Sequence, residues 1–142
     1  MDEETWQANT TPLSWVEDIY LQNATELMTY LQNPSPLPPG IMSRRYIISE
    51  PGEIMIRVKL KLGSELYLSP EYAHILFIDV STIVVHHPHQ GIGFAFMQDL
   101  IVEARRYGYG VTLSGGYNAG SLRLAEKLGM VRNGFYQQFI IV

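Results

Sequence analysis

An apolar run in the middle of the chain restricts the possible folds more than any other feature. The run Ile75–Val85 is rich in β-branched residues, and only Asp79, Ser81 and Thr82 interrupt it. A strand whose side chains are apolar on both faces has to be covered on both faces. The sequence therefore predicts a strand at the centre of a sheet.

Helical and extended patterns alternate on either side of this run. Upstream, Arg45–Ile48 and Ile54–Leu62 flank a turn at residues 50–53, and the strict alternation of the second segment predicts a hairpin with one wet face. Downstream, we expect a helix from Gly93 to Gly108, a strand Val111–Leu113, a helix Ala119–Leu128 and a last strand Gly134–Val142. Strands alternating with helices indicate an α/β layer fold.

The N-terminal part has a helical pattern. From Ser14 onwards, apolar residues such as Val16 and Ile19 recur at three- and four-residue spacing, and Ser14 with Glu17 fits a capping box. We therefore expect one amphipathic helix that ends before the proline-rich segment 34–40. Residues 1–12 are polar and are expected to be a flexible lead-in.

Bulk properties exclude several classes of protein. A chain of 142 residues suits a single domain, residues 1–142. It contains no cysteine, which excludes disulfides, thiolate catalysis and Cys-based zinc sites. The net charge of −4 and the lack of a dense Lys/Arg stripe argue against direct binding of nucleic acid. Without a membrane-length apolar run or a basic signal start, we expect a soluble cytoplasmic protein that does not enter a membrane.

The end of the apolar run carries the most informative motif. After Val85 the chain reads His86-His87-Pro88-His89-Gln90-Gly91-Ile92-Gly93, so a buried strand passes through glycines directly into a helix. The first amides of a helix lack internal acceptors, and the helix dipole adds positive charge there, which suits a pyrophosphate. An ordinary tight strand-to-helix turn explains a Gly-x-Gly motif equally well. A Rossmann fingerprint is rejected because its third glycine would fall on Phe96.

Two segments resemble the GNAT N-acetyltransferase superfamily. The first is His89–Gly93, which is similar to the end of the family's cofactor loop, Arg/Gln-x-x-Gly-x-Gly/Ala. The second is Asn118–Met130, which is similar to Asn-x-x-Ala-x-x-Leu-Tyr-Glu-Lys-Leu-Gly-Phe. The resemblance covers roughly residues 72–142. It implies a mixed, mostly antiparallel central sheet flanked by helices, an α+β fold.

The resemblance also implies acetyl-CoA as cosubstrate and a primary amine as acceptor. The strand would pair with the pantetheine arm, the loop and helix start would hold the pyrophosphate, and the second segment would border the cofactor. The residues that bind the cofactor would then be Ile83, Val84, Val85, His89, Gln90, Gly91, Ile92, Gly93, Phe94, Asn118 and Ser121.

Ile83 and Val85 depart from the family pattern at its usual valine and proline positions, and two usually functional positions depart from it as well. Pro88 occupies the usual Arg/Gln position of the loop, and Gln90 is a candidate to replace that contact. Ala125 occupies the position where relatives often carry a Tyr that protonates the departing thiolate. Tyr117 is our first candidate for the missing phenol, ahead of Tyr136. Asn118 suits a helix cap as well as it suits a cofactor contact.

Asp79 is the first candidate for the general base. A carboxylate on a central strand either finds hydrogen-bonding partners or has its pKa raised by desolvation. A purely structural role is equally compatible with the sequence. His86, His87 and His89 are expected to lie in solvent or near the pyrophosphate, and we expect no metal because no acidic partner stands at a recognised spacing.

The sequence supports three functional readings. The first is an N-acetyltransferase in which an amine, small molecule or protein, attacks acetyl-CoA directly. The second is a GNAT-fold binding or regulatory module that has lost activity, since two functional positions depart from the pattern. The third is an assembly protein, because the apolar segment Phe139–Val142 is a candidate for pairing with a second copy at a sheet edge, as in a homodimer.

Overall fold

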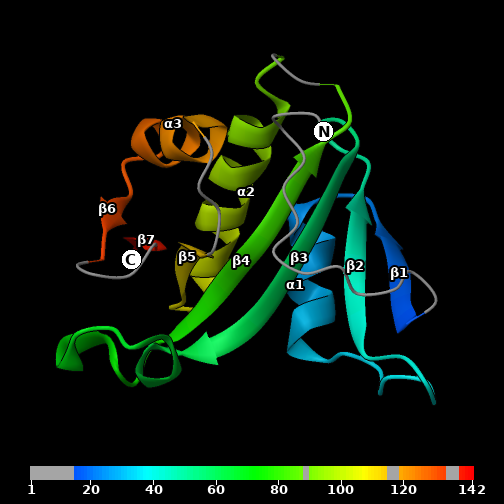
Figure 1. The fold of residues 1–142 in the computed structure, drawn as a ribbon, viewed down its shortest axis with the longest axis horizontal. Coiled ribbons are helices and arrows are strands. Elements are labelled where there is room, and N and C mark those ends of the chain that lie inside the picture. The colour runs from blue at the N-terminus through cyan, green and yellow to red at the C-terminus, as the bar shows by residue number, and fades with distance from the viewer. Residues whose placement is uncertain (1–14, 88–89, 115–118, 134–137) are drawn as a thin grey trace.

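A computed structural model describes residues 15–87, 90–114, 119–133 and 138–142. Its elements form a seven-stranded sheet with the order β1-β2-β3-β4-β5-β7-β6, together with three helices (Figure 1). The strands are β1 Val16–Leu21, β2 Ser43–Ile48, β3 Ile54–Leu62, β4 Leu76–Val85, β5 Gly110–Ser114, β6 Val131–Arg132 and β7 Gln138–Ile141. The helices are α1 Ala24–Gln32, α2 Ile92–Arg106 and α3 Ala119–Lys127, and short 3-10 turns occur at η2 Gly63–Leu66 and η3 Pro70–Tyr72.

The sheet is mixed and mostly antiparallel, which confirms the predicted fold class. Parallel pairing joins β1 to β2 and β4 to β5, whereas the other four neighbouring pairs are antiparallel. The central apolar run is β4, the fourth strand in the order, as predicted. The hairpin β2–β3 is also confirmed, with a register that pairs Ile48 with Ile54.

All three helices pack against one face of the sheet. The two parallel strand pairs are joined through α1 and α2, and right-handed crossovers in the same direction place their helices on the same face. Leu27 and Met28 of α1, Leu100 of α2 and Ala125 of α3 belong to one buried cluster with the inward side chains of the sheet. The opposite face has a smaller apolar cluster, in which Leu66 and Leu68 cover Phe77 of β4.

The predicted first helix is wrong over its N-terminal half. Residues 16–21 form β1, and helix α1 begins only at Ala24. Asn23 is the N-cap, because its Oδ1 accepts a hydrogen bond from the Glu26 amide at 3.0 Å. The Glu26 carboxylate in turn accepts from the amide of Gln22.

A physical reason for the error lies in the pairing of β1 with β2. The strand places Ile19 towards the core, and its acidic residues pair with the basic residues of β2. Arg44 Nε lies 3.0 Å from Glu17 Oε1, and Arg45 Nε lies 2.8 Å from Asp18 Oδ1. These long-range contacts outweigh a local pattern that fits a helix equally well.

The C-terminal strand lies between two neighbouring strands of the sheet. Strand β7 covers Gln138–Ile141, while residues 134–137 lie outside the described part. It pairs with β5 on one side and with the two-residue strand β6 on the other. Phe139 and Ile140 therefore already have partners in β6. Assembly through the segment Phe139–Val142 stays a prediction.

No helix in the described ranges combines the length and apolar character that crossing a membrane requires.

Candidate functional site

Helix α2 starts directly after the turn that follows β4. Its N-cap is Gly91, with φ +73° and ψ 11°, a left-handed conformation that residues with a Cβ resist. No side chain of the described residues caps this end, and its first turn contains no acidic residue. The first amides of α2 therefore face outward together with the positive end of the helix dipole.

Close packing fixes the start of α2 against the sheet. A Cβ on Gly93 would lie 3.2 Å from Cγ2 of Val85, and a Cβ on Gly52 would lie 2.6 Å from Cδ1 of Ile92. A Cβ on Gly91 would meet nothing within 4 Å. Gly93 thus lets the helix approach β4, whereas Gly91 leaves space in front of the helix end. Gln90 is exposed and Phe94 is half-buried.

The pairing of β4 with β5 ends before β4 reaches the turn that leads to α2. Their parallel pairing runs from Phe77 with Gly110 to Val80 with Leu113, yet β4 continues to Val85. On its other side, β4 pairs with β3 as far as Val85. Arg57 pairs with Thr82 and Val58 pairs with Val80, so Ser81 has no partner and forms a bulge. Within the described residues, Ile83, Val84 and Val85 thus pair on one side only. We call the gap beyond Val80 the β4–β5 opening.

Asp79 lies beside this opening, on the face opposite the helices. Only 5% of it is exposed, and its Oδ1 accepts hydrogen bonds from Thr112 Oγ1 at 2.7 Å and Ser114 Oγ at 2.5 Å. Its Oδ2 lies 3.6 Å from Nζ of Lys61. Of the two outcomes expected for a carboxylate on this strand, the structure has the one in which the carboxylate finds partners.

The hydrogen bonds continue from Ser114 across β7. Gln138 Nε2 donates to Ser114 Oγ at 3.4 Å, and Asn133 Nδ2 donates to Gln138 Oε1 at 2.7 Å. These polar residues were not among the predicted site residues. The sequence signal is weak: polar and apolar residues alternate in β5, and Gln138 is the only polar residue of β7. The register of three strands brings them together.

His86 and His87 lie at the end of β4 and are exposed. Their rings meet edge to face, with centroids 4.6 Å apart, and the His86 amide donates to the carbonyl of Glu53 at 3.0 Å. Among the described residues, no group of three or more His, Asp or Glu side chains is placed to hold a metal ion.

Several predicted site residues cannot be placed. His89, Tyr117 and Asn118 lie outside the described residues, as does Tyr136, the second phenol candidate. Ser121 lies in the first turn of α3, consistent with the predicted helix. The proposed roles of Ser121 and of these four residues remain predictions.

Ala125 is fully buried in the main core, and its carbonyl accepts a hydrogen bond from the Met130 amide at 3.0 Å.

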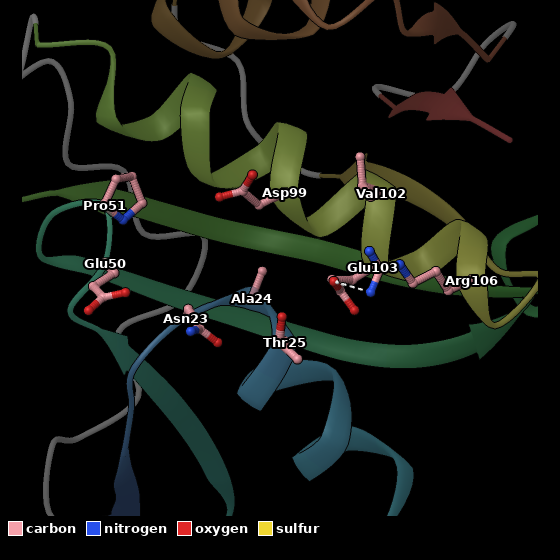
Figure 2. Close-up of a pocket in the computed structure, with 9 residues that line it drawn as sticks. All are labelled: Asn23, Ala24, Thr25, Glu50, Pro51, Asp99, Val102, Glu103 and Arg106. Atoms are coloured by element: carbon pink, nitrogen blue, oxygen red, sulfur yellow. Dashed lines mark ion pairs between the residues drawn. The ribbon is translucent and has the colours of Figure 1, made fainter.

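A separate cavity of about 410 Å³ lies on the helix side (Figure 2). It opens between the start of α1, the β2–β3 turn and α2, and Asp99 and Glu103 project from α2 towards it. Glu50 adds a third carboxylate, and Arg106 forms an ion pair with Glu103 at 3.2 Å. No predicted site residue lines this cavity.

Two solved structures are similar to this fold. Arabidopsis thaliana NAA60 in complex with acetyl-CoA matches at 20% identity and a TM-score of 0.46, covering 74% of this chain and 70% of that one. NAA60 in complex with a bisubstrate analogue matches at 20% identity and a TM-score of 0.46, covering 66% and 69%.

This similarity concerns the fold alone, and the ligands are those of NAA60. No family model and no curated protein matches the sequence.

Proposed function

We propose that this chain is an acetyl-CoA-dependent N-acetyltransferase that transfers an acetyl group to an amine. The observation that carries the proposal is the uncapped start of α2 next to the β4–β5 opening. Outward amides at Ile92, Gly93 and Phe94 suit a diphosphate, and the open space at Gly91 leaves room for its oxygens. Gln90, exposed at the same turn, is placed to add a side-chain contact.

The β4–β5 opening supports the same proposal. The one-sided pairing of Ile83–Val85 leaves backbone groups for an extended amide-bearing arm. An arm that follows this edge from the start of α2 ends near the bulge at Ser81. The thioester of the bound cosubstrate supplies the acetyl group.

Asp79 is the proposed base, directly or through water. An amine attacks only when neutral, so a proton has to be accepted near neutral pH. The two hydroxyl donors hold Oδ1 of Asp79 in place, while Oδ2 faces the half-exposed side chain of Lys61. An oriented carboxylate with one oxygen free of hydroxyl donors can accept a proton.

One observation favours a second candidate, a GNAT-fold binding or regulatory protein without turnover. Ala125 supplies no acid for a leaving thiolate, and it is fully buried in the core. Tyr117 is the proposed substitute, and its place relative to the opening is untested.

Release of free thiol from acetyl-CoA, measured with a panel of amines and peptides, tests the activity. We expect turnover with the unchanged chain and a loss of roughly 100-fold or more in Asp79→Asn. Asn keeps an acceptor oxygen for the two hydroxyls, so the variant should fold.

Asp99→Asn is the matched control, since it makes the same change at an exposed position of α2. Silence across the panel together with measurable coenzyme binding would favour the non-catalytic candidate. Undiminished turnover in Asp79→Asn would show that Asp79 is not the base.

A further inference from the structure

The face of the sheet opposite the helices carries a row of basic side chains. Along β3, Ile54, Ile56 and Val58 are buried in the core that the helices cover. Alternate residues point to the other face, and three of them are Arg57, Lys59 and Lys61, which we call the basic row. A cationic row is unexpected in a chain with a net charge of −4.

Neighbouring carboxylates neutralise only part of the positive charge on this face. Arg45 of β2 donates two hydrogen bonds to Asp18, at 2.8 and 3.0 Å, and this hydrogen bonding raises the pKa of Arg45. Lys61 lies 3.6 Å from Asp79.

Arg57 and Lys59 have no ion pair with the described part of the chain. Arg57 is half-buried and Lys59 is exposed. Two cations on this face are thus available to an external anion.

The register places these two cations next to the β4–β5 opening. Lys59 lies opposite Asp79, and Arg57 lies opposite Thr82, at the bulge. The Ser81 hydroxyl is 3.5 Å from the carbonyl of Arg57. Arg57 and Lys59 lie on β3, so only β4 stands between them and the opening. Neighbouring strands are about 4.8 Å apart.

We infer that the basic row binds an anionic group of the acceptor, so that the preferred acceptor is an amine with carboxylates close to its amino group. The inference rests on the proposed function, in which the amine reaches the opening beside Asp79. A carboxylate one or two residues from that amine then comes within reach of the long Arg57 and Lys59 side chains. Their fields also attract an acidic acceptor before contact.

The charge of the 410 Å³ cavity is opposite to that of the basic row, which supports this inference. That cavity lies on the helix side of the sheet and is lined by three carboxylates, of which Glu103 is paired with Arg106 while Glu50 and Asp99 are not paired with it. An acidic acceptor is repelled there and attracted at the basic row. The two faces of the sheet thus select ligands of opposite charge.

Three peptides of equal length with a free N-terminal amine test the inference. They differ only in carrying Glu, Gln or Lys at positions 2 to 4. Binding is measured by fluorescence anisotropy with coenzyme A present, and thiol release is measured with acetyl-CoA. We expect the Glu peptide to bind about tenfold more tightly than the Gln peptide, and the difference should shrink as salt is raised.

The double variant R57Q/K59Q should abolish this preference, because it removes both cations that have no ion pair in the described part of the chain. R105Q/K127Q is the control, because it removes the same charge from exposed positions of α2 and α3 and should keep the preference. Circular dichroism and thermal unfolding establish that both variants fold.

The two proposals fail in different ways. Equal binding of the Glu and Gln peptides overturns the acidic-acceptor inference, whether or not thiol is released. A Glu preference that survives in R57Q/K59Q also overturns it. Preferred binding of the Glu peptide without thiol release keeps the basic row as a binding site and contradicts the proposed activity.

Discussion

Gly91 carries the proposed diphosphate site at the scale of single residues. Its φ of +73° favours glycine, and a Cβ at this position would point into the open space in front of α2. Gly108, at the other end of the same helix, has a φ of +75° and also faces open space. The two glycines therefore share a left-handed backbone conformation and differ in their distance from the proposed site.

Replacing either glycine with alanine separates strain from binding. We expect Gly91→Ala and Gly108→Ala each to lower the free energy of unfolding by about 1 kcal/mol, because both force a Cβ into the left-handed region. Only Gly91→Ala should weaken binding of coenzyme A, as measured by calorimetry, since its methyl group occupies the space for phosphate oxygens. Equal affinities in the two variants would contradict this assignment.

Asp79 illustrates what the sequence predicts about a residue and what it does not. Its place within an apolar run predicts a buried carboxylate that needs partners, and the structure has such a group. Thr112 and Ser114 are 33 and 35 residues away in the chain, and they reach Asp79 only because β5 pairs with β4 in one register. A local pattern carries no information about that register.

At the scale of elements, the start of α1 was the main error of the sequence prediction. Asn23 and Glu26 form the observed cap, whereas the sequence pattern favoured Ser14 and Glu17. Asn23→Ala should lower the free energy of unfolding by about 1 kcal/mol, because the Glu26 amide loses its acceptor. Chemical denaturation followed by circular dichroism measures the change.

Ser14→Ala is the informative comparison for the helix boundary. Residues 16–21 form a strand, so loss of a hydroxyl at position 14 should leave the unfolding free energy within about 0.5 kcal/mol of the unchanged chain. A larger loss in Ser14→Ala than in Asn23→Ala would contradict the observed start of α1.

Element length and periodicity explain which other elements were predictable. Helix α2 is long, periodic and followed by Gly108, and β4 is long and apolar, so both were predicted nearly to their ends. Strand β6 has only two residues and no pattern of its own. Strand β1 has six residues, too few to distinguish strand from helix without its long-range pairing to β2.

At the scale of the whole molecule, the sheet separates two differently charged environments. The helices and the acidic cavity between α1 and α2 lie on one side, and the basic row of β3 lies on the other. The β4–β5 opening lies where the described pairing of β4 with β5 ends, on the strand that leads to the start of α2. In our account, this position lets one ligand be held at the helix end while another approaches from the basic face.

Titration of the ¹⁵N-labelled chain with coenzyme A, followed by amide chemical shifts, tests this account most directly. The start of α1 serves as an internal control, because it is also a helix N-terminus but is capped by Asn23 and bordered by carboxylates. We predict the largest shift changes at Gly91–Phe94 and along Ile83–Val85, with little change at Ala24 and Thr25. Shift changes centred on α1, or no saturable change at Gly91–Phe94, would contradict the proposed coenzyme site.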